Sequence, residues 1–238
     1  MSRLIFLSLL IWLYLPAKAE ESSRKSLPQY EWKQTSKTYS ANGISTFVSR
    51  VPGQSIKTFK GITLMPYSRY QILEAMADTA RYCDWIYNCK AVDTSIPEDD
   101  DGRTLYLKFH GFLFVKDRDV TIKLDVWQDK KNGIIHITSS NFDSGYPKQK
   151  GLVRIRKLNS HWQLIEQGPG STEVHYETFI DLGGNISPWV ANIIVNDAPK
   201  STLKKVRQLL ESGFYGAEDL DSIATLPDER LRTHFYED

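Results

Sequence analysis

The sequence carries no excess of charge of either sign. Among its 238 residues are 30 Lys and Arg and 29 Asp and Glu, which gives a formal net charge of +1. A chain this close to neutral has no overall electrostatic attraction for nucleic acid, so nucleic-acid binding is not expected. With 41% hydrophobic and 25% charged residues, the composition is that of an ordinary globular protein. We expect one monomeric domain, long enough to hold a core and a cavity within it.

The familiar motifs of catalysis and metal binding are also absent. The sequence has no Gly-x-Ser-x-Gly, no glycine-rich phosphate loop and no carboxylate signature of the glycosidase type. The five histidines show no His-x-x-x-His spacing; they are His110, His136, His161, His175 and His234. His175 and Glu177 share one face of a predicted strand, and an exposed face is a simpler interpretation than an acid–base pair. No catalytic residue, metal site or cofactor is therefore predicted.

Long apolar runs are missing everywhere except at the N-terminus. There, Arg3 precedes an apolar run from Leu4 to Leu15, and Ala17-Lys18-Ala19 follows it. This combination is typical of a secretory signal peptide, and the run is shorter than the roughly 20 residues of a membrane span. We expect cleavage after residue 19 and export to the periplasm or the extracellular space; an uncleaved anchor is the alternative. The polar residues 20–29 are expected to form a flexible lead-in.

Cysteine is scarce, with only Cys83 and Cys89 in the chain. Two thiolates without a nearby histidine or a second cysteine pair do not complete a tetrahedral zinc site. An exported protein enters an oxidising compartment, where an even number of cysteines favours pairing. A local disulfide that closes a short loop around Trp85 is therefore predicted.

Turn signals and apolar periodicity predict three helices with strands between them. A short helix is expected at 30–38 and a second one at 68–80. A long helix is expected at 187–210, with a kink or break near Pro199 because its two apolar stripes are out of phase. Strands are expected at 43–51, 56–64, 91–95, 104–109, 120–127, 134–139, 151–158, 162–167 and 172–181.

Apolar and polar residues alternate along these strands. Leu105, Leu107 and Phe109 oppose Tyr106 and Lys108, and Val120, Ile122, Leu124 and Val126 oppose Thr121, Lys123 and Asp125. This period of two predicts a long, twisted antiparallel sheet with one apolar concave face and one solvent-exposed face. The last helix carries an apolar stripe that would cover the concave face, formed by Ile186, Val190, Ile193 and Ile194. The predicted fold class is α+β.

Two short motifs permit more than one interpretation. Arg118 between Asp117 and Asp119 would suit a substrate clamp or a structural ion pair, and the ion pair is favoured because such charge clusters are commonly architectural. Gly183-Gly184 before the last helix would suit an anion site or a tight turn, and the turn is the simpler account.

Several short motifs occur in a fixed order that matches a known family. They are Phe59-Lys60-Gly61, Trp85, Asp117-Arg118-Asp119-Val120, the run from Tyr146 to Arg154, Trp162, the run from Ile180 to Gly184, Ser187-Pro188-Trp189 and Asn192. Through them, residues 30–212 resemble the steroidogenic acute regulatory protein-related lipid transfer (START) family, as a secreted bacterial-type member. Each motif alone is weak, and their order and spacing make the resemblance specific. Residues 213–238 are left as a C-terminal tail.

The resemblance implies a helix-grip fold, in which a curved antiparallel sheet wraps around a long C-terminal helix and encloses a tunnel for one lipid or sterol. It places the tunnel wall at the inward strand residues Leu105, Leu107, Phe109, Val120, Ile122 and Leu124. It places a lid at the 127–133 hairpin and at the start of the last helix, with Trp127, Trp189, Val190, Ile193 and Ile194. Steroid-handling members keep a carboxylate and an arginine in the tunnel, where Leu105 and Leu124 stand here. This departure favours a more uniformly apolar ligand.

The favoured hypothesis is a non-enzymatic carrier that binds one lipid-like molecule and releases it at a membrane surface. The alternative is an enzyme of the same fold, cyclase- or hydrolase-like, acting on an aromatic or polyketide substrate. It would need polar groups that converge inside the cavity, such as Tyr106, His110, His136 or His175, and alternation points Tyr106 outward. A third hypothesis, a partner-binding adaptor, would require a large exposed apolar patch.

Overall fold

A computed structural model describes residues 30–36, 43–96, 103–111, 114–129, 131–219 and 223. The strands are β1 (Lys33–Ser36), β2 (Ile44–Arg50), β3 (Lys57–Met65), β4 (Cys89–Asp93), β5 (Arg103–Phe109), β6 (Arg118–Gln128), β7 (Ile135–Asn141), β8 (Val153–Arg154), β9 (Lys157–Gly168) and β10 (Ser171–Asp181). The helices are α1 (Arg69–Ala77), the 3-10 turn η1 (Thr79–Arg81), α2 (Tyr82–Trp85), α3 (Pro188–Asn196) and α4 (Ala198–Glu211). The predicted signal peptide, the lead-in 20–29 and most of the predicted tail lie outside the described residues.

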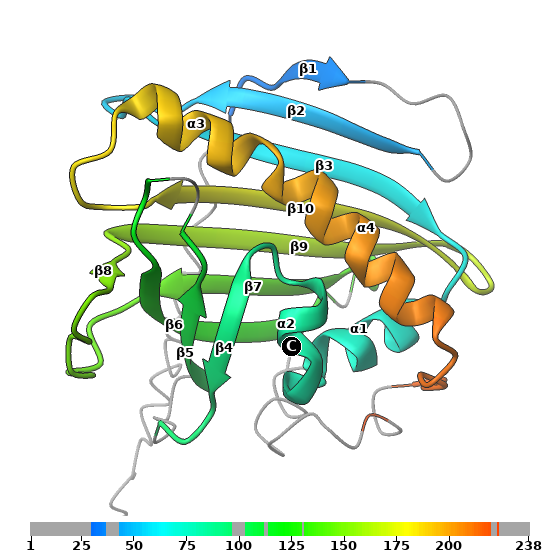
Figure 1. The fold of residues 1–238 in the computed structure, drawn as a ribbon. Coiled ribbons are helices and arrows are strands. Elements are labelled where there is room, and N and C mark those ends of the chain that lie inside the picture. Colours follow the sequence, from blue (N-terminus) through cyan, green and yellow to red (C-terminus); the bar gives the residue numbers. More distant parts are fainter. Residues whose placement is uncertain are drawn as a thin grey trace, which may run out of the picture.

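One curved sheet forms the body of the molecule. Its strand order is β1-β2-β3-β10-β9-β7-β6-β5-β4, and every neighbouring pair in that order is antiparallel. The short strand β8 adds a parallel pairing with β6. The C-terminal helices lie across the sheet, while α1 and α2 lie beside α4 (Figure 1). The predicted helix-grip fold, a curved antiparallel sheet around a C-terminal helix, is confirmed.

The C-terminal helix is divided into two segments. Ser187 caps α3 by accepting a hydrogen bond from the backbone N–H of Val190, and Pro188 occupies the first turn. Helix α3 ends at Asn196, and α4 begins at Ala198 with Pro199 in its own first turn. The carbonyl oxygen of Asp197 between them accepts a hydrogen bond from the N–H of Ser201 at 2.9 Å. Proline has no N–H to donate, so it is tolerated in a first turn and not in a helix interior. The predicted break is therefore confirmed, and it turns α4 so that its apolar side faces the sheet.

Helix α4 approaches the sheet most closely at Gly61 of β3. A Cβ atom built at this glycine would lie only 2.6 Å from Cδ1 of Leu203 and 3.4 Å from Cβ of Pro199. Leu203 itself is completely buried. Any residue larger than glycine would push the helix away from the sheet, because interiors of this density have no spare room.

Two predicted elements are wrong. The N-terminal helix at 30–38 is instead strand β1, which pairs with the edge of β2. There the Thr35 hydroxyl donates to the carbonyl oxygen of Thr46 at 3.1 Å and lies 3.0 Å from the Thr46 hydroxyl. The predicted strand at 151–158 is regular only at β8 and at the first residues of β9. In both places a long-range pairing overrides the local preference, since an unpaired strand edge offers a full row of backbone donors and acceptors.

The outer face of β5 and β6 is not solvent-exposed as the alternation predicted. Tyr106, Asp119 and Thr121 are 1% exposed. The segment between β7 and β9 covers them: the Tyr146 ring stacks on that of Tyr106 with centroids 4.1 Å apart, and the Arg154 guanidinium pairs with Asp119 at 3.0 Å. A long connection folded back over the sheet supplies this second layer, which the strand pattern alone does not reveal.

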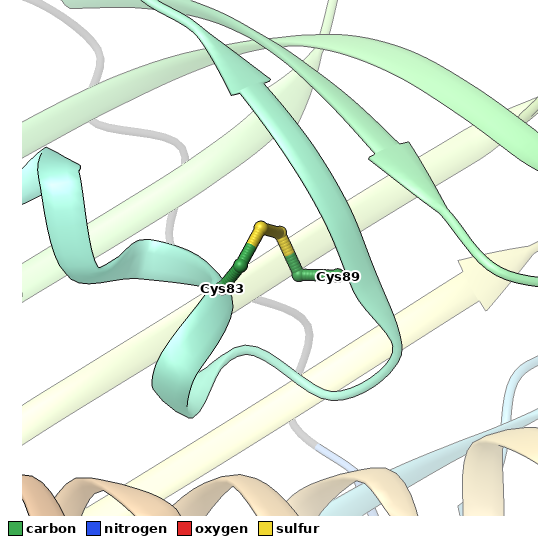
Figure 2. The surroundings of a disulfide bond; sticks show 2 residues. All are labelled: Cys83 and Cys89. Atoms are coloured by element: carbon green, nitrogen blue, oxygen red, sulfur yellow. A yellow bond between two sulfur atoms is a disulfide. The ribbon is translucent and has the colours of Figure 1, made fainter.

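The predicted disulfide between Cys83 and Cys89 is present, with an S–S distance of 2.04 Å. It joins helix α2 to the first residue of strand β4 across a sequence separation of 6 residues (Figure 2). Trp85 lies inside the closed loop and is buried. The bridge therefore holds a buried aromatic side chain of α2 against the end of the sheet.

The chain continues to pack against the domain beyond residue 212. The backbone N–H of Ala217 donates to Glu74 Oε2 at 2.9 Å, and the Tyr215 hydroxyl bonds Asp78 at 3.1 Å. Ile223 is completely buried. These contacts attach the start of the predicted tail to α1. In the part of the chain that is described, no helix has the length and apolar character needed to cross a membrane.

Candidate functional site

A cavity of about 170 Å³ lies between the concave face of the sheet and the helices. One buried water needs roughly 15 Å³ on the same measure, so this space is far larger than a packing defect. Strands β5, β6, β7, β9 and β10 contribute one wall, and helices α1, α2 and α4 contribute the other. A concave, mostly apolar pocket of this kind is the usual form of a small-molecule site.

The apolar wall follows the alternation of β5 and β6. Leu107, Phe109, Ile122 and Leu124, four of the six predicted wall residues, line the cavity together with Val126. Leu73, Met76 and Ala77 of α1 face them from the helical side. Their contact with a ligand stays a prediction.

The other two predicted wall residues, Leu105 and Val120, do not contribute to the cavity lining. They are 0% and 1% exposed and belong to the hydrophobic core. Alternation assigns a residue to one face of a strand, but it does not say which residues on that face are covered by their neighbours.

The predicted lid residues whose side chains the structure describes lie outside the cavity wall. Trp127 points to the outer face, where its ring stacks on His136 with centroids 4.9 Å apart, because its neighbour Val126 occupies the inner face. Trp189 and Ile193 of α3 are 73% and 41% exposed, and Val190 is half-buried without reaching the wall. The side chain of Ile194 is outside the description. At this end the cavity is lined instead by Leu182, Ala198 and Thr202.

Four aromatic rings form a connected row along the cavity. Trp162 of β9 stacks on Tyr176 of β10 at 4.0 Å, Trp85 meets Trp162 edge-on at 6.0 Å, and Tyr82 meets Trp85 at 5.4 Å. This row was not predicted from the sequence, since the rings come from α2, β9 and β10, which are far apart in the chain. Burial raises the pKa of Tyr82 and that of Tyr176 to about 12. Both phenols therefore stay neutral at physiological pH and act as apolar surface rather than as bases.

A minority of the described lining residues are polar, among them Arg103, His110 and Arg118. The hydroxyls of Ser139 and Ser160 bond to each other at 2.6 Å. Of the four histidines that the structure describes, His110 alone contributes to the wall, and Tyr106, His136 and His175 do not. The polar residues named for an enzyme of this fold therefore do not converge in the cavity.

Two histidines on the outer face, His136 and His161, pair with each other, and a third, His175, pairs with Glu173. His136 Nδ1 and His161 Nε2 are 2.9 Å apart, and their rings are parallel within 6°. Burial and the neighbouring His136 lower the pKa of His161 to about 4. His161 is therefore uncharged at pH 7, and it lies on the face of β9 opposite Trp162 and the cavity.

The charge cluster at the start of β6 is arranged differently from the prediction. Asp117 bonds Lys90 Nζ at 2.6 Å, and Asp119 pairs with Arg154 at 3.0 Å. Arg118 points to the opposite face and forms part of the cavity wall. The expected ion pair of Arg118 with its two neighbours is thus wrong, because successive side chains on a strand point to opposite faces. Gly183 and Gly184 have φ values of +63° and +70°, which agrees with the tight turn.

Comparison with known proteins places this architecture in one family. The START domain model matches residues 13–212. The uncharacterized protein PA1579 of Pseudomonas aeruginosa is 32% identical over 171 residues, which is 71% of this chain and 83% of that protein. A solved fragment of a STAR-related lipid transfer protein from Xanthomonas axonopodis matches 76% of this chain and 98% of its own, with 23% identity and a TM-score of 0.67.

Human STARD10 matches 76% of this chain and 73% of its own, with 19% identity and a TM-score of 0.64. At these identities the two solved structures show the shared fold only. The family model and the Pseudomonas relative extend the likeness to the sequence itself, over most of the chain. The protein therefore belongs to the START domain family.

Proposed function

We propose that this protein is a lipid carrier that holds one lipid-like molecule in the cavity and transfers it between membranes. The observation that carries the proposal is the cavity wall, which is mostly apolar on both the strand and the helix side. Each Å² of apolar ligand surface that leaves water contributes roughly 25 cal/mol to binding. The wall residues Leu107, Phe109, Ile122 and Leu124 are the proposed ligand contacts. The name of the similar Xanthomonas protein supports lipid transfer.

Native mass spectrometry of the purified mature protein tests the proposal. We expect a bound species with the mass of one lipid, which dissociates under collision or organic extraction. The proposal would be contradicted if the protein, purified from a lipid-rich host, carried no lipid and took up no lipid analogue. An enzyme of the same fold would instead convert an aromatic or polyketide substrate. The polar residues named for that activity do not come together in the described cavity wall.

Export through a cleaved signal peptide is part of the proposal. The N-terminal sequence pattern and the disulfide between Cys83 and Cys89 support it, because disulfides persist in oxidising compartments. N-terminal sequencing of the exported protein should begin at Glu20. A mature chain that still contains Leu4 to Leu15 would show a membrane-tethered protein.

Exposed apolar side chains on α3 and in the β5–β6 connection are the proposed membrane contact. Trp189 and Ile193 of α3 are exposed, and Phe114 is 100% exposed. The β5–β6 connection also contributes His110, Gly111 and Val115 to the cavity wall. Tryptophan favours the interface between hydrocarbon and water. A surface of this kind, next to the cavity, would let the ligand pass into the bilayer without crossing water.

Replacing Trp189 by alanine should slow lipid transfer between vesicles about tenfold. Insertion of one large apolar side chain contributes ~1.5–3 kcal/mol, and each 1.4 kcal/mol changes an equilibrium about tenfold. The measurement is fluorescent lipid exchange between donor and acceptor vesicles. Phe214→Ala is the matched control: Phe214 is 76% exposed but follows the far end of α4, so transfer should hardly change. Equal transfer rates for the two variants would show that Trp189 is not part of the membrane contact.

A further inference from the structure

The cavity wall contains a buried arginine. Arg118 is the first residue of β6 and lies opposite Phe109 of the neighbouring strand β5. It is 4% exposed. Its Nη1 donates to the carbonyl oxygen of Lys116, and its Nε has no hydrogen-bond partner. Burial lowers the pKa of the guanidinium. An arginine keeps its charge even so, so the wall holds a cation with an unused donor.

No carboxylate among the described residues forms an ion pair with this cation, and Asp117 offsets only part of the effect of burial on its pKa. Its sequence neighbours Asp117 and Asp119 are paired with Lys90 and Arg154 respectively, on the other face of the strand. A buried charge without a partner is strongly unfavourable. The arrangement is therefore incomplete without an anion that enters from the cavity side.

The space beside the guanidinium is open to such an anion. Arg118 forms part of the cavity wall together with Gly111 and Val115, so an anion inside the cavity can reach the guanidinium. From Arg118 the cavity continues along β6 past Ile122 and Leu124 to Val126. The eight steps from Arg118 to Val126 span about 26 Å at ~3.3 Å per residue, a length that suits an extended long-chain alkyl group.

We propose that the ligand is an amphiphile with an oxyanion head, a carboxylate or a phosphate monoester, which pairs with Arg118 while its alkyl chain follows Phe109, Ile122 and Leu124. This inference rests on the proposed function and adds the chemical class of the ligand. The planar guanidinium offers paired donors that match both kinds of oxyanion. A neutral head such as an alcohol would leave the buried cation unpaired.

The test uses the delipidated mature protein and three probes with the same chain: dodecanoic acid, dodecyl phosphate and dodecan-1-ol. Binding is followed by the fluorescence of Trp85 and Trp162, which line the cavity. We expect the two anionic probes to bind about ten- to a hundredfold more tightly than the alcohol, as a charge-assisted hydrogen bond predicts. Equal affinity for acid and alcohol overturns the inference and leaves the carrier intact. Failure of all three probes to bind contradicts the carrier itself.

Variants of Arg118 assign the effect to this residue. Arg118→Gln should lose the preference for the anionic probes while keeping the affinity for the alcohol. Arg118→Lys should keep part of the preference, because the charge remains while the paired donors are lost. Arg156→Gln is the control, since Arg156 is exposed and pairs with Asp181 on the surface. If circular dichroism shows that Arg118→Gln does not fold, the preference of the wild type and of Arg118→Lys for the anionic probes tests the assignment. If Arg118→Gln folds and keeps the full preference for the anionic probes, the assignment to Arg118 is overturned.

Inorganic phosphate distinguishes a lipid head from a free anion. Without an alkyl chain, phosphate lacks the apolar surface that the rest of the cavity would bury, so at equal concentration it should not displace dodecyl phosphate. Displacement at equal concentration would show a simple anion site and overturn the proposal of an amphiphile. Leu124→Arg should weaken the binding of dodecyl phosphate, because the alkyl chain is placed along Leu124. Unchanged binding of dodecyl phosphate in this variant would overturn the proposal in the same way.

Discussion

Replacing Leu124 by arginine is expected to lower the affinity for a fluorescent phospholipid at least a hundredfold. Leu124 lies in the cavity wall, half-buried and opposite Arg103 on β5. The new guanidinium would enter an apolar space where an unpaired ion costs several kcal/mol, and each 1.4 kcal/mol is a factor of ten in affinity. Titration of the labelled lipid into the purified variant measures the loss.

Lys123→Leu is the matched control for this prediction. Lys123 is the preceding residue of β6 and points to the outer face, so it does not line the cavity. Its replacement should leave lipid binding unchanged. A shift of one residue in the strand would exchange the two outcomes, since every side chain would change face. Circular dichroism must show both variants folded; if both then bind like the wild type, β6 does not line the site.

Replacing Asp119 by alanine is expected to reduce the free energy of unfolding by about 3–5 kcal/mol, the usual cost of removing one partner from a buried ion pair. Asp119 accepts two hydrogen bonds from Arg154, at 3.0 and 3.1 Å, and one from the Tyr106 hydroxyl at 2.9 Å. Its loss would leave the buried phenol and the guanidinium without their acceptor. Urea unfolding followed by circular dichroism gives the difference.

Asp125→Ala is the matched control for Asp119→Ala, because it also removes a carboxylate from the outer face of β6. Asp125 is half-buried and forms no ion pair with the residues that the structure describes. Its replacement should change stability by less than about 0.5 kcal/mol, as surface substitutions usually do. Similar losses for the two variants would mean that the Asp119 cluster contributes nothing specific, and that the covering segment is held by other contacts.

The inner face of the sheet could be predicted because strand geometry is local. Side chains alternate along any extended strand, whatever packs against them. Leu107, Phe109, Ile122 and Leu124 were therefore assigned correctly to the concave side. The same applies to the last helix, where Ser187 and Pro199 act through their own backbone neighbours. The disulfide followed from counting cysteines in a chain expected to be exported.

The outer face and the chain ends could not be predicted because long-range contacts decide them. Residues 30–36 hold no strong local signal, and β1 forms only because β2 presents an unpaired edge. Tyr106 and Asp119 alternate as surface residues, yet Tyr146 and Arg154 bury them from a connection that the period of two does not describe.

Only part of the cavity wall could be predicted from the sequence. Leu105 and Leu107 have the same type, spacing and face, but only Leu107 reaches the cavity, since curvature of the sheet and the position of the helices decide which side chains are covered. The aromatic row joins Tyr82 and Trp85 of α2 to Trp162 of the distant strand β9. Residue order thus determines which face of an element is apolar, through backbone geometry. Tertiary packing alone decides where the apolar faces meet fully and where they leave a space, because that depends on the distances between whole elements.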